Sequence, residues 1–213
     1  FFLLTFLDNL GKMHNPPIKK YPSVTIIIPA HNEEKGIAGT IESALSIEYP
    51  KDKLEIIVVE NGGSKDRTVE IANKYKEKGV RVFSLEKGGK GYAMNYIIKR
   101  AKGEIIITTD ADTWMGTEWI STMVGSFNNS TGFVLGITLD QMSNNPVHAF
   151  HALDSIGMCV IGTALAEMNN PITCRGTNIA FRKDAYLQVR EKVLHLSVTL
   201  GNREWLMQEI NNS

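Results

Sequence analysis

Short apolar runs alternate with segments of helical periodicity through the first half of the chain. The runs are continuous and rich in β-branched residues, which is typical of strands buried on both faces of a parallel sheet. The pattern predicts strands at residues 24–28, 55–59, 80–85 and 104–109, and helices at residues 33–47, 66–78 and 92–101, with Gly79 and Gly103 placed as helix stops. Because strands and helices alternate, we expect right-handed βαβ units and an α/β fold, with a mostly parallel sheet flanked by helices.

The second half of the chain is less regular. After Trp114 the pattern predicts a helix at residues 117–127, strands at 132–139 and 177–181, a long apolar helix at 147–166 and a further helix after Glu204. The uninterrupted apolar part of the long helix has the length of a buried or interfacial helix, because crossing a bilayer takes about 18 apolar residues or more. No internal repeat or clear linker divides the sequence, so we expect one domain.

An apolar run, FFLLTFL, occupies residues 1–7. This run is too short to cross a bilayer alone. We expect residues 1–23 to be an N-terminal segment that contains the stub of a membrane helix; a strand or helix packed on the core is the alternative.

Charge and cysteine content narrow the classes of partner. The 213 residues include 23 Lys and Arg against 23 Asp and Glu, so there is no electrostatic footprint for a nucleic-acid backbone, and we expect no nucleic-acid partner. The cysteines, Cys159 and Cys174, are too few for a disulfide framework and lack the paired spacing of a zinc site.

Polar and acidic residues follow the predicted strands directly. Residues 29–34 (PAHNEE) follow the first strand, residues 60–66 (ENGGSKD) the second and residues 110–112 (DAD) the fourth, while the loop at residues 87–91 (KGGKG) precedes a helix. Ligands of open α/β sheets bind outside the carboxyl ends of the strands. These segments should therefore converge on one binding edge.

Asp110 and Asp112 are candidate metal ligands. Carboxylates suit Mg²⁺ or Mn²⁺, which typically bind one or two carboxylates together with substrate phosphates. If the chain stays extended here, the two side chains face different ways, so that one can hold a metal while the other reaches a sugar hydroxyl. A solvated loop is the alternative, because D-x-D is common by chance, but the position at a strand end favours the metal site.

The glycine-rich loop allows close approach of an anion to the backbone, with Lys90 able to reach a diphosphate. The loop lacks the P-loop pattern, and no G-x-G-x-x-G follows the first strand, so a dinucleotide fold is disfavoured. A plain turn before a helix is the alternative.

Together these positions resemble the family 2 glycosyltransferases of the GT-A fold, whose sheet is Rossmann-like. Residues 24–34 look like the family's opening strand with P-A-x-N-E-E, residues 58–68 like V-D-D-G-S-x-D-x-T, residues 88–95 like G-G-K-x-x-A-x-N, residues 110–112 like its D-x-D, and residues 176–182 like G-T-N-x-A-F-R. The turn departs from the pattern, because Glu60 and Asn61 replace the paired aspartates and Gly62-Gly63 adds a residue.

The resemblance implies a domain at residues 24–213, with a nucleotide-sugar-binding half at 24–115 and an acceptor-side half at 116–213. The implied donor is a nucleotide sugar with uridine as its base. Ala30, Glu33 and the Glu60-Asn61 turn would cradle the base and ribose, Lys90 would lie near the diphosphate, Asp110 near the ribose or donor sugar, and residues 176–178 along the donor-sugar and acceptor pocket. The full set of implied donor-binding residues is Pro29, Ala30, Asn32, Glu33, Glu60, Asn61, Lys90, Asp110, Gly176, Thr177 and Asn178, with Asp112 and Asp110 on Mg²⁺ or Mn²⁺.

The implied reaction is an inverting transfer of the hexosyltransferase type. The metal on Asp112 would neutralise charge on the diphosphate leaving group while a carboxylate base takes the proton of the acceptor hydroxyl. In the family the catalytic Asp usually stands in an E-D pair that opens a helix beyond G-T-N, and this pair is missing here. Aligning the helix by its apolar spacing places Asn202-Arg203 at the pair, and a shift of two residues places Glu204-Trp205 there. Glu204 is the nearby candidate base; an acid favoured at a helix N-terminus is the alternative reading.

The acceptor is open among polysaccharide, lipid-linked sugar and protein. The apolar N-terminal run and the long apolar helix favour a membrane-linked acceptor, handled at the cytoplasmic face of the membrane, or a cytoplasmic location for the fragment. Two other functions stay open. One is a donor-binding or regulatory domain without catalysis, suggested by the missing base; the other is a sugar nucleotidyltransferase, against which the absence of an early G-x-G-T-R loop argues.

Overall fold

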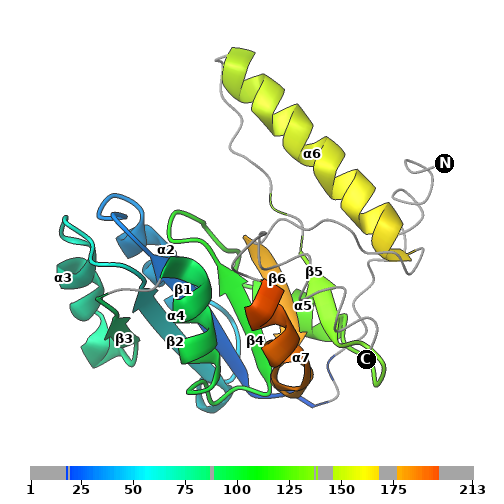
Figure 1. Cartoon of the computed structure of the whole chain (residues 1–213), viewed down its shortest axis with the longest axis horizontal. Helices are drawn as coiled ribbons and strands as arrows, with labels where there is room; N and C mark the ends of the chain where they lie inside the picture. The colour runs from blue at the N-terminus through cyan, green and yellow to red at the C-terminus, as the bar shows by residue number, and fades with distance from the viewer. Residues whose placement is uncertain are drawn as a thin grey trace.

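In the described part of the chain, six strands form one sheet in the order β3-β2-β1-β4-β6-β5, and Figure 1 shows helices on both faces of this sheet. The computed structural model describes residues 18, 20–86, 89–136, 138, 146–167 and 177–196. The strands are β1 (Val24–Ala30), β2 (Leu54–Glu60), β3 (Arg81–Ser84), β4 (Ile105–Thr109), β5 (Phe133–Leu135) and β6 (Asn178–Arg182). β1 to β4 pair in parallel and β6 is antiparallel to both of its neighbours, which confirms an α/β fold with a mostly parallel sheet.

The strand order reverses between β1 and β4. From β1 the chain passes outward to β2 and β3, and it then returns to place β4 on the other side of β1. Such a switch point leaves a crevice at the carboxyl ends of the two strands, which is where open α/β sheets bind ligands. The residues that follow β1 and β4 are therefore the ones to examine for function.

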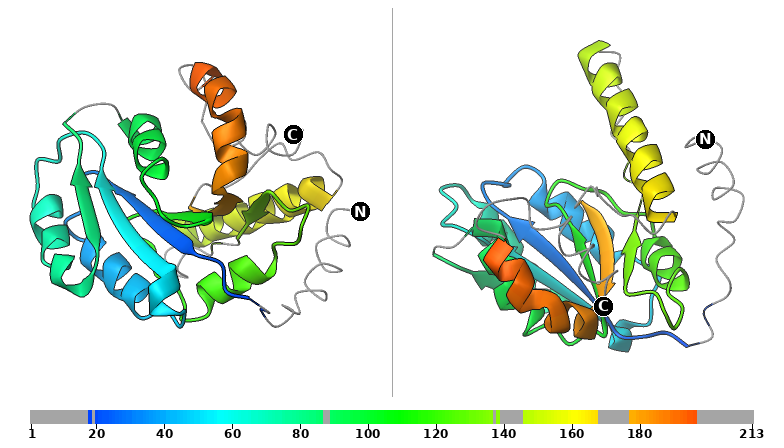
Figure 2. Two further views of the ribbon diagram at one scale, coloured as in Figure 1. Left: turned by 90° about the horizontal axis from the view of Figure 1, so that it is seen from below. Right: turned by 45° about the vertical axis from the view of Figure 1, so that its right-hand side comes forward.

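Among the described residues, helices cover both faces of the sheet, which Figure 2 shows from two further directions. The helices α2 (Ile37–Leu45), α3 (Thr68–Asn73) and α5 (Trp119–Gly125) contribute to the hydrophobic cluster on one face, and α4 (Gly89–Ile98) and α7 (Lys183–Leu196) to the cluster on the other. The short 3-10 turns η1 (Lys51–Lys53) and η2 (Lys76–Lys78) precede β2 and follow α3.

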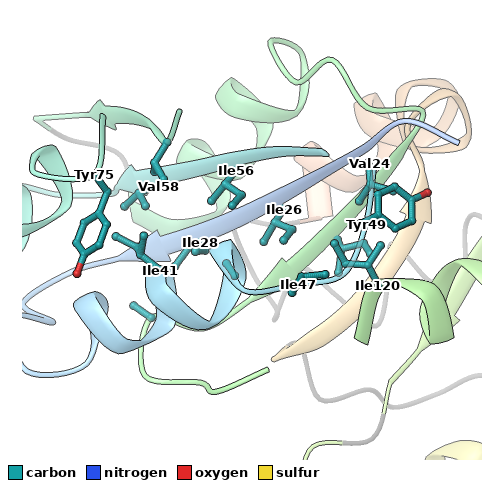
Figure 3. Close-up of a cluster of buried hydrophobic side chains, with 14 of the residues drawn as sticks. Val24, Ile26, Ile28, Ile41, Ile47, Tyr49, Ile56, Val58, Tyr75 and Ile120 are labelled. Carbon is teal, nitrogen blue, oxygen red and sulfur yellow. The ribbon is translucent and has the colours of Figure 1, made fainter. Parts of the chain in front are cut away.

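The central strand β1 is buried on both faces. Ile26 and Ile28 point into the cluster drawn in Figure 3, and Ile27 points into the opposite cluster; all three are 0% exposed. Burial of such a side chain stabilises the fold by about 1.5–3 kcal/mol. This is why the strand appears in the sequence as an uninterrupted apolar run rather than an alternating one.

The expected helices differ from the observed ones at their ends. The helix expected at residues 33–47 begins at Ile37, because residues 33–36 form a turn in which the backbone N–H groups of Gly36 and Ile37 donate to Glu33 O. The helix expected at 66–78 is divided into α3 and η2, and Gly79 ends it in a left-handed conformation with φ +89°. The helix expected at 92–101 begins earlier, at Gly89.

The helix α7 was not predicted. Its sequence, KDAYLQVREKVLHL, carries charged residues through most of its length, and only Tyr186 and Val189 of its described side chains are buried against the sheet. Apolar residues at positions 186, 189, 193 and 196 nevertheless recur at helical spacing, so the sequence carried a signal for this helix.

The long helix α6 (Pro146–Glu167) matches the expected 147–166 and projects away from the sheet in Figure 1. Several of its apolar side chains are exposed, including Val147 at 60%, Phe150 at 70% and Leu153 at 67%. In the part of the chain that the structure describes, no helix combines the length and apolar character needed to cross a membrane. The expected stub within residues 1–23 falls mostly outside the described residues, and the helix expected after Glu204 falls wholly outside them.

Candidate donor-binding site

A pocket of about 270 Å³ lies at the carboxyl ends of β1, β2 and β4. It is lined by Pro29, Ala30, His31, Glu33, Asn61, Lys90, Asp110, Ala111 and Asp112. Segments from four parts of the sequence meet here, as the strand-end pattern led us to expect. The pocket coincides with the switch point between β1 and β4.

Asn32 joins two of the loops around the pocket. Its backbone has φ +55°, a left-handed conformation that asparagine tolerates better than most residues. Its backbone N–H donates to Ser64 Oγ at 3.0 Å, and its Oδ1 accepts from the Lys65 N–H at 2.8 Å. Asn32 thus fastens the loop after β1 to the loop after β2, and it does not line the pocket.

Glu60 lies behind the pocket and organises the turn after β2. Its side chain is 2% exposed, and Oε1 accepts from the backbone N–H groups of Gly62 (3.0 Å) and Ser64 (2.8 Å) and from Ser64 Oγ (3.0 Å). Burial alone would raise the pKa of Glu60, but hydrogen bonds led by those from Ser64 outweigh it, so the pKa lies below its ordinary value of 4.5. The carboxylate is therefore ionised at neutral pH, and its Oε1 accepts hydrogen bonds from residues of the turn that follows it.

Asn61 faces the pocket and links β1 to α4. Its amide is oriented so that Nδ2 donates to Ala30 O at 2.6 Å and Oδ1 accepts from the backbone N–H of Lys90 at 3.2 Å, which is the orientation that satisfies both groups. The side chain of Asn61 therefore fixes the start of α4 against the end of β1. This contact holds the Lys90 backbone at the pocket wall.

The chain turns at Ala111-Asp112 instead of remaining extended, so both Asp110 and Asp112 line the same pocket. The turn rests on α2: Thr40 Oγ1 donates to Ala111 O at 2.7 Å, and a Cβ at Gly36 would lie 2.9 Å from that same oxygen and 3.0 Å from Asp112 Cα. Only glycine at position 36 lets the helix approach the turn this closely. Asp110 is half-buried and Asp112 is exposed.

The neighbouring carboxylates act on Glu33. Burial raises the pKa of Glu33 above its ordinary value of 4.5, and the negative charges of Asp112, Asp110 and Asp66 raise it further, while His31 opposes the rise. Lys90 offsets part of this charge, because its Nζ lies 2.5 Å from Asp110 Oδ1. The pocket is thus acidic, with one ion pair inside it.

The donor set fits a divalent cation that also binds phosphate oxygens. Asp110 and Asp112 supply hard carboxylate oxygens on one pocket wall, and Mg²⁺ or Mn²⁺ bind through one or two carboxylates plus substrate phosphates. Among the described residues, no group of three or more His, Cys, Asp or Glu side chains is placed to enclose a metal. The residues therefore provide a metal site that is only partly enclosed by protein, in which a ligand would supply the remaining coordinating oxygens.

The residues expected along the sugar and acceptor side lie next to the Asp110 turn. Asn178 pairs with Thr109 across β6 and β4, and its Oδ1 accepts from Trp119 Nε1 at 3.0 Å. Thr177 Oγ1 donates to Thr138 Oγ1 at 3.1 Å. Neither Thr177 nor Asn178 lines the pocket.

Glu204 and Gly176 lie outside the described residues. His31 and Ala111 line the pocket but were not singled out from the sequence, although both stand inside motifs that were. Both could have been found from the sequence, because His31 lies in the motif directly after β1 and Ala111 lies in the motif directly after β4.

An open α/β sheet with a polar pocket at its switch point defines an α/β protein that binds a ligand at the carboxyl ends of its strands. The family described as glycosyl transferase family 2 matches residues 25–189. This match covers most of the sequence, and the chain therefore belongs to glycosyl transferase family 2.

Relatives and solved structures agree with this assignment. The chain is 39% identical over 115 residues to a probable glycosyltransferase of Bacillus subtilis, YdaM, which is 51% of this chain and 27% of that protein. It is 34% identical over 97 residues to the poly(ribitol-phosphate) β-N-acetylglucosaminyltransferase TarS of Staphylococcus aureus, covering 44% of this chain and 17% of TarS. The matches thus span about a quarter or less of these relatives.

The fold is that of GT-A glycosyltransferases. The mannosyltransferase PcManGT of Pyrobaculum calidifontis, solved with GDP-Man and Mn²⁺, superposes with a TM-score of 0.64 at 23% identity and covers 88% of this chain and 54% of its own. TarS of S. aureus, solved with UDP-GlcNAc, gives 0.55 at 23% identity over 79% of this chain and 47% of its own. The GT-A-like, Rossmann-like fold expected from the sequence is confirmed.

Proposed function

We propose that this chain is the catalytic domain of an inverting glycosyltransferase that transfers a sugar from a UDP-sugar to a glycan or lipid-linked acceptor, assisted by Mg²⁺ or Mn²⁺. The observation that carries the proposal is the pocket at the switch point, where Asp110, Asp112 and Lys90 meet in a chain of this family. A site that binds a nucleotide sugar with a metal requires carboxylates that hold the metal and a cationic group that binds the diphosphate.

A nucleotide sugar is supported as donor by the neighbours, which were solved with GDP-Man and with UDP-GlcNAc. We propose UDP rather than GDP because TarS is similar to this chain both in sequence and in fold, and the TarS structure holds UDP-GlcNAc. Ala30 and Asn61 stand at the ends of β1 and β2, where the base and ribose would lie. Asn32 and Glu60 would act indirectly, by holding the loops that shape this part of the pocket.

For the reaction we propose that the residues of this chain divide between charge neutralisation and proton transfer. A bound divalent cation supplies a Lewis acid that stabilises the diphosphate leaving group. Asp110 and Asp112 hold that cation, and Lys90 donates to the diphosphate. Glu204 is proposed as the base that accepts the proton of the acceptor hydroxyl, and residues 176–178 as part of the wall on the acceptor side.

For its location we propose the cytoplasmic face of a membrane, where a lipid-linked or polymeric acceptor would be presented. Exposed apolar side chains on α6, such as Leu153 and Ile161, support this proposal. They would be stabilised by contact with the interfacial region of a bilayer.

Isothermal titration with UDP, in the presence and absence of Mn²⁺, tests the donor site. We expect Mn²⁺ to strengthen UDP binding, and we expect Asp112→Asn to remove most of that gain because it removes a charged metal ligand. Asp52→Asn is the matched control, because Asp52 is exposed in η1 at the opposite end of β2. GDP and a UDP-sugar are titrated in parallel.

Three outcomes decide the proposal. Binding of UDP that depends on Mn²⁺ and on Asp112 supports the proposal. Binding of GDP and not of UDP would show that the donor nucleotide carries guanine in place of uracil. A folded chain that binds none of these nucleotides contradicts it. Slow release of UDP from the bound UDP-sugar, measured without an acceptor, would separate a catalytic domain from a domain that only binds the donor.

A further inference from the structure

An ion pair joins two walls of the pocket. Lys90 Nζ, in the first turn of α4, lies 2.5 Å from Asp110 Oδ1 at the end of β4. The lysine side chain is 41% exposed and the aspartate side chain is 28% exposed, so the pair is partly shielded from solvent. Charges in such a position attract each other more strongly than charges in bulk water. Any ligand of either group must therefore compete with the other group.

Lys90 is also the only lysine or arginine among the described residues that line the pocket, against the carboxylates of Glu33, Asp110 and Asp112. The raised pKa of Glu33, caused first by burial and then by these neighbouring acids, shows that the negative charge is felt across the pocket. The ammonium group of Lys90 therefore lies in an acidic pocket, beside the carboxylate of Asp110.

The backbone of Lys90 is held while its ammonium group can move. Asn61 Oδ1 accepts from the Lys90 N–H at 3.2 Å and Asn61 Nδ2 donates to Ala30 O at 2.6 Å, which fixes the start of α4. The lysine side chain is a flexible four-carbon stem. Rotation about its bonds can move the ammonium from Asp110 to an anion in the same pocket without moving the helix.

We propose that Lys90 is an exchangeable cation that couples metal binding to nucleotide binding. In the free protein it neutralises Asp110 and competes with the divalent cation. When a nucleoside diphosphate enters, the ammonium transfers its hydrogen bond to the diphosphate and leaves Asp110 to the metal. Metal and nucleotide then strengthen each other's binding by the same factor, as thermodynamic linkage requires. This inference rests on the proposed function, in that the pocket must accept a nucleoside diphosphate and a divalent cation.

The test measures Mn²⁺ binding to the full chain by the electron paramagnetic resonance signal of free Mn²⁺, with and without UDP. For Lys90→Met we expect binding of Mn²⁺ alone to become about tenfold tighter, because the competing ammonium is gone; coupling factors between sites are typically about 5–150. The factor by which UDP strengthens Mn²⁺ binding should become smaller in this variant, and the factor that remains reflects direct contact between the cation and the diphosphate. Lys90→Gln is a second neutral variant with the same expectation.

Two controls separate the exchange from general effects of charge or packing. Lys90→Arg keeps a cation beside Asp110 and should bind Mn²⁺ alone as weakly as the unchanged protein. Lys35→Met removes a charge from an exposed lysine in the loop after β1, outside the pocket lining. It should change Mn²⁺ binding by less than about twofold, as expected for screened surface charges.

Mn²⁺ affinity that is unchanged or weaker in both neutral variants would overturn the proposal, even if UDP still binds. An equal gain in Lys35→Met would also overturn it, because net charge would then explain the effect. If the unchanged protein binds neither UDP nor GDP, the proposed function fails. The comparison with Mn²⁺ alone would still show whether Lys90 competes for Asp110.

Discussion

Glu60 illustrates how a single residue can serve a binding site without entering it. Its buried carboxylate accepts hydrogen bonds from two backbone N–H groups and the Ser64 hydroxyl, and Ser84 Oγ donates to its second oxygen at 3.2 Å. Asn61, the next residue, is thereby turned toward the pocket. The residue type at position 60 shapes the turn, and the residue at position 61 lines the pocket.

We expect Glu60→Gln to lower the free energy of unfolding by about 1–3 kcal/mol at about pH 7, because the turn loses a charged acceptor. The pKa of Glu60 lies below its ordinary value of 4.5 in the folded state, so its contribution is present above that value and is lost as pH falls through the lowered folded pKa. The difference between the two proteins should therefore shrink in acid. Urea unfolding at about pH 7 and about pH 3 measures it.

The control for this prediction is Glu77→Gln, which makes the same chemical change at an exposed position in η2. It should alter stability by no more than about 0.5 kcal/mol. A stability difference for Glu60→Gln that is the same at both pH values would contradict the assigned pKa shift.

At the level of elements, the approach of α2 to the turn after β4 positions the acidic pair. Gly36 lies against the backbone of Ala111 and Asp112, and Gly39 lies against the indole of Trp114. Thr40, which belongs to α2, donates from its Oγ1 to Ala111 O. One helix face with small residues at positions 36 and 39 therefore supports the turn that carries Asp110 and Asp112.

We expect Gly36→Ala to weaken Mn²⁺-dependent UDP binding about tenfold, which corresponds to about 1.4 kcal/mol. The new Cβ would lie 2.9 Å from Ala111 O and 3.0 Å from Asp112 Cα, and because both are backbone atoms the turn must move. The φ of −99° at Gly36 is acceptable for alanine, so backbone strain is not the cause. Isothermal titration measures the loss.

Gly116→Ala provides the matched control, because no atom lies within 4 Å of a Cβ at that position and its backbone φ is not in the left-handed region. UDP affinity in this variant should equal that of the unchanged protein. Equal affinity in a folded Gly36→Ala would show that the position of the turn does not govern binding.

The elements that could be predicted from the sequence are those with a strong local signal. β1, β2 and β4 are continuous apolar runs because both of their faces are covered, and the residues after them are polar because the strand ends form the pocket. Helix starts were less predictable: α4 begins at Gly89 although glycine is a poor helix former, because Asn61 holds the Lys90 N–H. Such a contact between distant segments leaves no local pattern.

Within the site, the sequence identified the residue types but not all of their positions. Asp110, Asp112, Lys90, Asn61 and Glu33 line one pocket, as their strand-end placement implied. Glu60 and Asn32 were grouped with them, and the structure places both in the contacts that join and shape the loops. Distinguishing a wall residue from a supporting residue requires the three-dimensional arrangement of the turn, because both kinds are polar and adjacent in sequence.

At the scale of the whole molecule, the pocket and the long helix lie on different parts of the structure. The pocket is at the switch point of the sheet, whereas α6 projects away from the sheet in Figure 1. The two halves expected at residues 24–115 and 116–213 share one sheet, because β6 and β5 extend it beyond β4. α6 lies between β5 and β6 in the sequence, outside the elements that line the pocket.

If α6 contacts a membrane surface, its exposed apolar side chains should govern the binding of the whole chain to lipid. We expect the chain to float with vesicles of phosphatidylcholine and phosphatidylglycerol, and we expect Leu153→Glu with Ile161→Glu to lower the partition coefficient at least about tenfold, because two apolar contacts are replaced by charges. Both side chains are exposed, at 67% and 41%, so the fold should be retained, and circular dichroism checks this.

Leu187→Glu makes the same change on α7, where the side chain is 38% exposed, and should leave flotation unchanged. A chain that stays in solution, or paired variants that float as well as the unchanged protein, would exclude α6 as the contact and leave UDP binding at the pocket unaffected, since that site is built from different elements.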